Sequence, residues 1–152
     1  MHNLNLPAYK YQLKEIDGKL AIFDSIRKKY VVLTPEEWVR QHIVHHLNDD
    51  LKYPSSRTNI EGGLRYNSRS KRTDVMIYDD EMTPLVLVEC KAPNVKMDEK
   101  VVRQLATYNS QCNAKLLITT NGLVTFAVLC KDGEYAMLQE IPSYNSLKQM
   151  FT

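Results

Sequence analysis

The sequence predicts a single α/β domain, and two patterns carry this prediction. The segment 84–93 begins with five apolar residues, continues with Glu-Cys-Lys and ends at a proline. Short apolar runs bounded by prolines are typical of strands buried on both faces. The segment 34–50 has the 3.6-residue period of a helix with one apolar face. A chain of 152 residues with 43% hydrophobic content is long enough to enclose a core around both elements.

The first 33 residues predict a β appendage. Residues 10–15 and 19–23 alternate apolar and polar side chains around Asp17-Gly18, a dipeptide that suits a tight hairpin turn. The apolar run 30–33 is long enough for one more short strand. We expect this appendage to belong to the same domain as the rest of the chain (1–152). Residues 34–122 would then form the main body, and residues 123–152 would add C-terminal strands and a short helix.

The start of the first helix is marked by several local signals. Thr34 suits the N-cap, Pro35 suits the first helical position, and Glu37 closes a capping box. The apolar stripe that follows predicts a helix as far as about residue 50. Glu36 falls at the top of this stripe, whereas the pattern predicts that Glu37 points toward solvent.

Histidines also lie on this helix. His42 and His46 have the four-residue spacing of a zinc-binding pair, but the sequence between them is not that of a His-Glu-x-x-His site. We favour surface histidines over a metal site here, without excluding the latter.

The remaining elements follow from short apolar runs and turn residues. Strands are predicted at 73–78, 84–90, 115–119, 123–129 and 135–141, and helices at 97–109 and 143–151. The acidic residues 79–81 form a turn between the first two of these strands, which would make the two strands antiparallel.

Three charged residues of this strand pair form the candidate site. Glu89 and Lys91 are two residues apart, so they point to the same face of their strand. Asp74 begins the preceding strand, and one register of the antiparallel pair places it beside Glu89. Charged groups at the end of a buried strand cost several kcal/mol unless they are paired or bind a metal.

The chemistry of this group favours metal-assisted hydrolysis. The carboxylates of Asp74 and Glu89, with the backbone carbonyl of Cys90, are oxygen ligands suited to Mg²⁺ or Mn²⁺. Glu36 could add a ligand or hold a metal-bound water. Lys91 could lower the pKa of that water, orient it, or neutralise a pentavalent phosphate. The group therefore has the equipment for cleaving a phosphodiester.

Structural roles would also explain each of these residues. Glu89 and Lys91 could form an ion pair that only stabilises the fold. Asp74 could be a surface acid near a turn, and Glu36 could act only on the helix dipole.

These residues also carry a family resemblance. Asp74 followed by Glu89-Cys90-Lys91 resembles the PD-(D/E)xK nuclease signature, with Thr73 where the motif often has proline. The stretch from Gln104 to Tyr108 is similar to the Gln-x-x-x-Tyr motif of RecB-like nucleases and of type I restriction R subunits. Residues 36–40 resemble the acidic first helix of those domains. Over about 34–122 the chain looks most like the N-terminal nuclease domain of type I restriction enzyme R subunits, including small stand-alone versions.

The resemblance implies a restriction-endonuclease-like fold, with a central mixed sheet flanked by helices, and magnesium-dependent cleavage of DNA. Asp74 and Glu89 would be metal ligands, Lys91 the catalytic lysine and Glu36 the helix carboxylate. Gln104 and Tyr108 would support the lysine or the DNA backbone. From the residues alone, Tyr108 could equally belong to the core and Gln104 could be a solvated neighbour.

Charge and composition restrict which kinds of partner are expected. The net charge of +2 does not by itself indicate a nucleic-acid-binding protein, but a basic run leads directly into Asp74. This run is either a solvated loop or a set of phosphate contacts, and its candidate residues are Arg65, Arg69, Lys71 and Arg72. The family resemblance implies DNA as the substrate. A homodimer, or partner subunits of a restriction-modification system, are the expected protein partners.

Two functions therefore remain. The first is a Mg²⁺-dependent DNA endonuclease, and the second is a catalytically silent nuclease-fold module that binds DNA or docks a partner. Neither an apolar run of membrane-spanning length nor a signal peptide is visible, and three widely spaced cysteines indicate reduced thiols. We expect a cytoplasmic protein. We also expect no bound nucleotide cofactor, because the sequence has no Gly-x-x-x-x-Gly-Lys-Ser/Thr loop.

Overall fold

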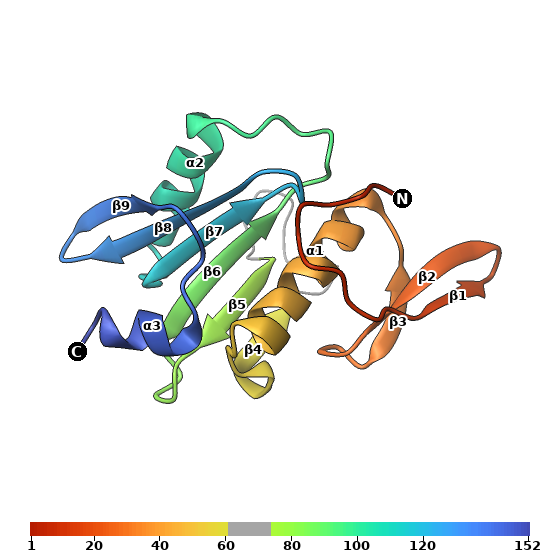
Figure 1. Cartoon of the computed structure of the whole chain (residues 1–152), viewed down its shortest axis with the longest axis horizontal. Coiled ribbons are helices and arrows are strands. Elements are labelled where there is room, and N and C mark those ends of the chain that lie inside the picture. Colours follow the sequence, from red (N-terminus) through yellow and green to blue (C-terminus); the bar gives the residue numbers. More distant parts are fainter. Residues whose placement is uncertain (61–73) are drawn as a thin grey trace.

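The fold is a six-stranded mixed sheet with helices on both faces and a three-stranded sheet at one side (Figure 1). The computed structural model describes residues 1–60 and 74–152. The strands of the large sheet follow the spatial order β4-β5-β6-β7-β8-β9, and only β6 and β7 are parallel to each other. The predicted α/β fold class is confirmed.

The elements have the following bounds. The small sheet consists of β1 (Leu13–Ile16), β2 (Lys19–Asp24) and β3 (Lys29–Val32). The large sheet consists of β4 (Thr58–Ile60), β5 (Val75–Tyr78), β6 (Pro84–Cys90), β7 (Leu116–Thr120), β8 (Thr125–Lys131) and β9 (Glu134–Leu138). The α-helices are α1 (Pro35–His45), α2 (Glu99–Asn109) and α3 (Tyr144–Gln149). A π-helical turn (His46–Asp50) extends α1, and a 3-10 turn (Ser55–Arg57) precedes β4.

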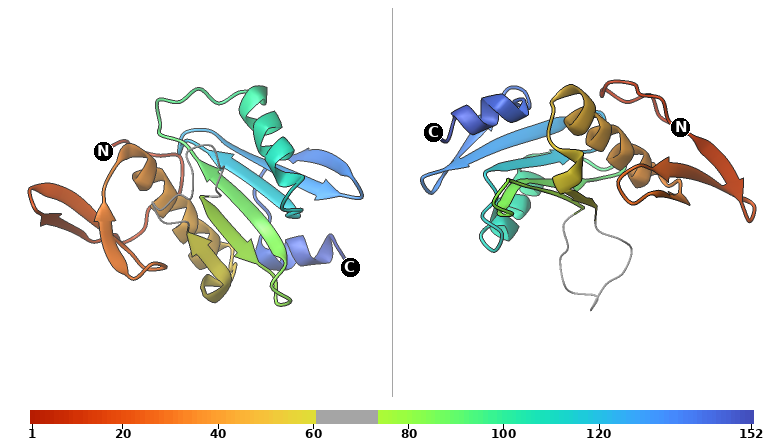
Figure 2. Two further views of the ribbon diagram at one scale, coloured as in Figure 1. Left: turned by 180° about the vertical axis from the view of Figure 1, so that it is seen from behind. Right: turned by 90° about the horizontal axis from the view of Figure 1, so that it is seen from below.

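The sheet is the middle layer of three (Figure 2). Helices α1 and α3 cover one face, where Ile43 and Leu147 pack with Val86 and Val88 of β6. Helix α2 covers the other face, where its Leu105 belongs to the same cluster as Leu87 of β6. Successive residues of β6 thus alternate between two cores, as expected for a strand buried on both faces. No helix in the two described ranges is long and apolar enough to cross a membrane.

The crossover from β6 through α2 to β7 positions the end of β6. The backbone N–H of Lys91 donates to the carbonyl of Thr120 at 2.8 Å. The amide of Asn121 donates to the carbonyl of Val95 at 2.9 Å, so the chain that leaves Lys91 is held beside the end of β7. This segment therefore leaves the sheet along a defined path.

The small sheet forms the predicted hairpin and adds a third strand. Asp17 and Gly18 have φ values of 51° and 78°, the left-handed conformation that a tight hairpin turn requires. Ile22 and Asp24, in the second half of β2, are fully buried against the rest of the chain. The small sheet is therefore packed against the body of the molecule, beside α1 (Figure 1).

Helix α1 begins at the predicted Thr34 cap, but the Glu37 carboxylate, predicted to close a capping box, contacts Arg27, Arg40 and Gln41 instead. The buried face of α1 is also wider than the sequence pattern indicates. The hydroxyl of Thr34 accepts from the backbone N–H of Glu37 at 3.0 Å. The prediction for the two glutamates was wrong, because Glu37 is buried whereas the side chain of Glu36 is 45% exposed. The reason is that Arg27, which follows β2, contacts the Glu37 carboxylate and covers the side of the helix assigned to solvent.

The prediction of a surface histidine was wrong for His42. Its ring is buried among those of Tyr9, Tyr11 and Trp38, and its Nδ1 lies 2.8 Å from the carbonyl oxygen of Trp38. Burial lowers the pKa of His42, which favours the neutral imidazole. The N-terminal segment, whose own packing the sequence pattern does not reveal, supplies the two tyrosines.

Candidate functional site

Two of the predicted carboxylate residues lie at neighbouring ends of β5 and β6. The two strands are antiparallel, as predicted, and Val75 pairs with Val88. Asp74 directly precedes Val75, and Glu89 directly follows Val88. The Oδ2 of Asp74 accepts a hydrogen bond of 2.7 Å from the backbone N–H of Cys90. Asp74 is therefore fixed to the strand that carries the Glu-Cys-Lys segment.

Glu89 and Lys91 form the second part of the site. Their Oε2 and Nζ atoms are 2.8 Å apart, and both side chains are mostly buried. Burial alone would lower the pKa of Lys91, but its hydrogen bond to Glu89 and the charges of Glu89, Asp74 and Glu36 raise the pKa above its ordinary value. The two residues point to the same face, as the two-residue period predicts.

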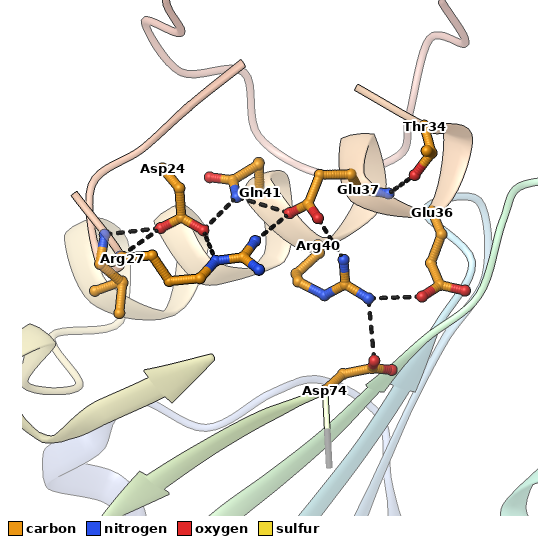
Figure 3. Close-up of polar contacts among 9 residues, drawn as sticks. Asp24, Arg27, Thr34, Glu36, Glu37, Arg40, Gln41 and Asp74 are labelled. Atoms are coloured by element: carbon orange, nitrogen blue, oxygen red, sulfur yellow. Dashed lines mark hydrogen bonds and ion pairs between the residues drawn. The ribbon is translucent and has the colours of Figure 1, made fainter. Parts of the chain in front are cut away.

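Arg40 joins Glu36 to Asp74, and this contact was not predicted. Its Nη2 lies 2.6 Å from Oε2 of Glu36 and 3.0 Å from Oδ1 of Asp74 (Figure 3). Its Nη1 lies 2.7 Å from Oε1 of Glu37. One guanidinium on α1 thus contacts three carboxylates, two on its own helix and one at the start of β5.

The environment of Arg40 keeps it charged. Its side chain is only 9% exposed, and burial alone would lower its pKa. The negative charges of Glu37 and Asp74, together with the hydrogen bond to Asp74, outweigh this effect and raise the pKa of Arg40. A buried arginine held by several carboxylates is a stable cation.

The network continues from Glu37 to the small sheet. The Oε2 of Glu37 accepts from Nη2 of Arg27 and from the amide of Gln41, both at 2.9 Å. The Oδ2 of Asp24 accepts from the same two side chains, at 2.5 Å from Arg27 and 3.0 Å from Gln41. The end of β2 is therefore connected to Asp74 through Arg27, Glu37 and Arg40 (Figure 3). Spacing along the helix offered one signal for this network, because Arg40 follows Glu36 by four residues and Glu37 by three.

Gln104 and Tyr108 lie on α2, which covers the sheet face that carries Leu87. Tyr108 is half-buried and packs against the cluster of Leu87 and Leu105, so a core contribution is part of its role. Gln104 is exposed. The two residues line an open hollow of about 710 Å³ along the helix, whose other described lining residues are Lys100, Arg103, Thr107 and Gln111.

The predicted basic residues of the site lie outside the described part of the chain. They fall within residues 61–73, and they are Arg65, Arg69, Lys71 and Arg72. Their assignment as phosphate contacts stays a prediction.

The residues that are present fit a hard divalent cation by their chemistry. Mg²⁺ is commonly held by one or two carboxylates and otherwise by water and substrate phosphate, and Asp74 and Glu89 supply such carboxylates on neighbouring strands. Within the two described ranges, no group of three or more His, Cys, Asp or Glu residues is arranged to hold a metal ion. Glu36, the third predicted carboxylate, instead shares Arg40 with Asp74.

Comparison with known proteins identifies the family. A fragment of a putative HsdR subunit of a type I restriction enzyme from Vibrio vulnificus YJ016 has the same fold, with a TM-score of 0.56 and 18% sequence identity over 78% of this chain. The matched region covers 25% of that fragment, so this chain spans about a quarter of its length. No curated protein sequence matches the chain. Residues 35–142, which include all the described site residues, match the family described as type I restriction enzyme R protein N terminus, and the chain belongs to this family.

Proposed function

We propose that this protein is a Mg²⁺-dependent DNA endonuclease of the restriction-enzyme type. The observation that carries the proposal is the meeting of Asp74, Glu89 and Lys91 at the ends of two adjacent strands, within a chain of the type I R-protein family. Two carboxylates and a lysine at the ends of adjacent strands have the charges that metal-assisted phosphodiester hydrolysis uses. In this proposal residues 34–122 are the nuclease core.

The roles of the residues follow from their charges. Asp74 and Glu89 would hold Mg²⁺ or Mn²⁺ together with water and the carbonyl of Cys90. The bound metal would supply a Lewis acid and lower the pKa of a coordinated water. Lys91, beside Glu89, would stabilise the negative charge that develops on the attacked phosphate. Glu36 would support Asp74 through the arginine that they share.

DNA is the proposed substrate, and α2 is the element that we propose lies along it. Lys100 and Arg103 give the hollow on α2 positive charge, and Gln104 adds an exposed amide that can bind a phosphate oxygen. Partner subunits of a type I restriction enzyme are the expected protein partners, because the family is defined on the R protein of such enzymes. A homodimer is the alternative assembly, since one site per chain cuts one strand.

Cleavage of plasmid and linear DNA tests the proposal. Wild-type protein and a Lys91→Ala variant are incubated with DNA and Mg²⁺, Mn²⁺ or EDTA. We expect metal-dependent nicking, and Lys91→Ala should lower its rate by at least about a hundredfold because charge stabilisation of the transition state is lost. Lys19→Ala, a change on the exposed turn side of β2, is the matched control and should cut like wild type.

One outcome would invalidate the assay, and another would overturn the proposal. Cutting that survives both EDTA and Lys91→Ala would come from a contaminating nuclease. Folded wild-type protein that binds DNA but leaves every substrate intact with either metal would instead support the non-catalytic binding module.

A further inference from the structure

Arg40 occupies the anionic side of the site. Its Nη2 lies between Oε2 of Glu36 and Oδ1 of Asp74, at 2.6 and 3.0 Å. Asp74 is one of the two carboxylates on which the proposed metal site depends. Each Asp74 oxygen therefore has a partner on the protein, since Oδ2 accepts from the N–H of Cys90.

The guanidinium is fixed in this position from its other side. Its Nη1 contacts Glu37 at 2.7 Å, and Glu37 is itself buried and held by Arg27 and Gln41. Moving Arg40 away from Asp74 would leave the Glu37 carboxylate with one fewer cation in a buried environment, which is costly. Arg40 is therefore expected to stay in place when other ions enter the site.

A fixed positive charge at this position opposes the binding of a second cation. Any divalent ion that uses the Asp74 carboxylate must share it with the Arg40 guanidinium. The repulsion between a charge of +1 and one of +2 at a few ångströms is screened weakly when the groups are largely buried. Arg40 also reduces the mutual repulsion of Glu36, Glu37 and Asp74, so it stabilises the site while no metal is bound.

We propose that Arg40 is a built-in counter-ion of the metal site, which holds the Glu36 and Asp74 carboxylates in the metal-free protein and weakens their affinity for divalent cations. The inference rests on the proposed function, since it assumes that Asp74 is a metal ligand. It also gives Arg40 a role toward DNA: with Arg40 and Lys91 in place, a phosphate meets a site whose carboxylates are largely compensated.

Calorimetric titration of metal-free protein with Mn²⁺, in the absence of DNA, tests this inference. Arg40→Met keeps much of the length of the side chain and removes its charge, and Arg40→Gln keeps a hydrogen-bond donor for Glu37. We expect both variants to bind Mn²⁺ at least about tenfold more tightly than wild type. Lys19→Met, which removes one charge from the exposed surface, should leave the Kd unchanged. Adding Asp74→Asn to Arg40→Met should abolish the gain, which locates the ion at this carboxylate.

The outcomes separate this inference from the proposed function. Wild type that binds Mn²⁺ while both folded variants bind it equally or more weakly would overturn the counter-ion role and leave the metal site standing. No Mn²⁺ binding by wild type or by either variant at millimolar concentration would overturn both. If Arg40→Met unfolds in EDTA, Mn²⁺ should restore its circular dichroism spectrum. If Mn²⁺ does not refold Arg40→Met, and Arg40→Gln binds Mn²⁺ with the same affinity as wild type, the counter-ion role of Arg40 would also be overturned.

Discussion

The two faces of the large sheet are built differently. The face under α1 and α3 carries the larger apolar cluster, and a buried charged network runs beside it from Asp24 to Asp74. The face under α2 carries a smaller cluster, and the outer side of α2 is polar and open to solvent along its hollow. More apolar side chains are thus buried on one face, while the other leaves the polar side of α2 accessible.

The candidate site lies where these two faces meet. Asp74 contacts Arg40 of α1, whereas Glu89, at the end of the neighbouring strand β6, contacts Lys91. Asp74 is thus held by a buried network, whereas Glu89 is paired with the partly exposed Lys91. The contrast makes predictions that differ for the two faces.

The largest effect is expected in the core under α1. Ile43 is fully buried in the larger cluster, so Ile43→Ala should lower the free energy of unfolding by about 4 kcal/mol through lost contacts and a cavity. Leu105→Ala on α2 should cost about 2 kcal/mol, because the smaller cluster beside an open hollow can relax more. Urea denaturation measures both values. A larger cost for Leu105→Ala would remove the contrast between the faces.

The next effect concerns the buried network at its far end. Asp24 is fully buried, so Asp24→Asn should cost about 2 kcal/mol at neutral pH because Arg27 loses a charged partner while the amide still fills the site. Burial alone would raise the pKa of Asp24, but hydrogen bonds and charge from Arg27 and a hydrogen bond from Gln41 lower it.

This lowered pKa fixes the sign of the pH dependence. A carboxyl group with a depressed pKa in the folded state adds stability above its unfolded pKa of about 3.9, and this stability is lost as the pH falls through the folded pKa. Wild type should therefore lose stability below about pH 4, and the difference between wild type and Asp24→Asn should shrink there. Thermal unfolding from pH 3 to 7 checks this, and a constant difference would contradict it.

The sequence predicted the parts of the molecule that depend on local pattern. The two-residue period gave the common face of Glu89 and Lys91, and the acidic turn gave the antiparallel pairing that sets Asp74 and Glu89 at neighbouring strand ends. The Thr34 cap was likewise correct. Each of these follows from a few neighbouring residues and from backbone geometry.

What the sequence did not predict depends on segments distant in the chain. The burial of Glu37 requires Arg27 to cover the helix, and the contact between Arg40 and Asp74 joins residues 34 positions apart. The burial of His42 requires Tyr9 and Tyr11 to fold back onto α1. The apolar period of a helix predicts one buried stripe. It cannot indicate that distant segments, here the N-terminal segment and Arg27, also cover other sides of α1.

A smaller effect is expected from His42 on the α1 side. Burial lowers its pKa, so the unfolded chain binds a proton more readily between the folded pKa and the unfolded value of about 6.5. Stability should therefore fall as the pH drops below about 6.5. His42→Gln should remove this part of the pH dependence. We expect the associated change in the free energy of unfolding to be smaller than that caused by Asp24→Asn. His45→Gln, on a ring paired with the exposed Asp49, is the comparison, and an equal effect of both changes would contradict the assignment.

The smallest effect on stability is expected for the Glu99–Arg103 ion pair on α2, which has the same spacing as the Glu36–Arg40 pair on α1. Glu99 and Arg103 have the same four-residue spacing as Glu36 and Arg40, but their side chains are 92% and 70% exposed. Exposed pairs of this kind contribute little because water and salt screen them, so Arg103→Ala should change the free energy of unfolding by less than about 0.5 kcal/mol, and the change should vanish in high salt. Arg40→Ala should lower the free energy of unfolding several times more than Arg103→Ala. This loss should depend less on salt, because the substitution leaves buried carboxylates without their cation. Urea denaturation of both variants at low and high salt compares them directly. Equal costs would mean that spacing along the helix, rather than burial between the helix and the sheet, determines what such a pair contributes.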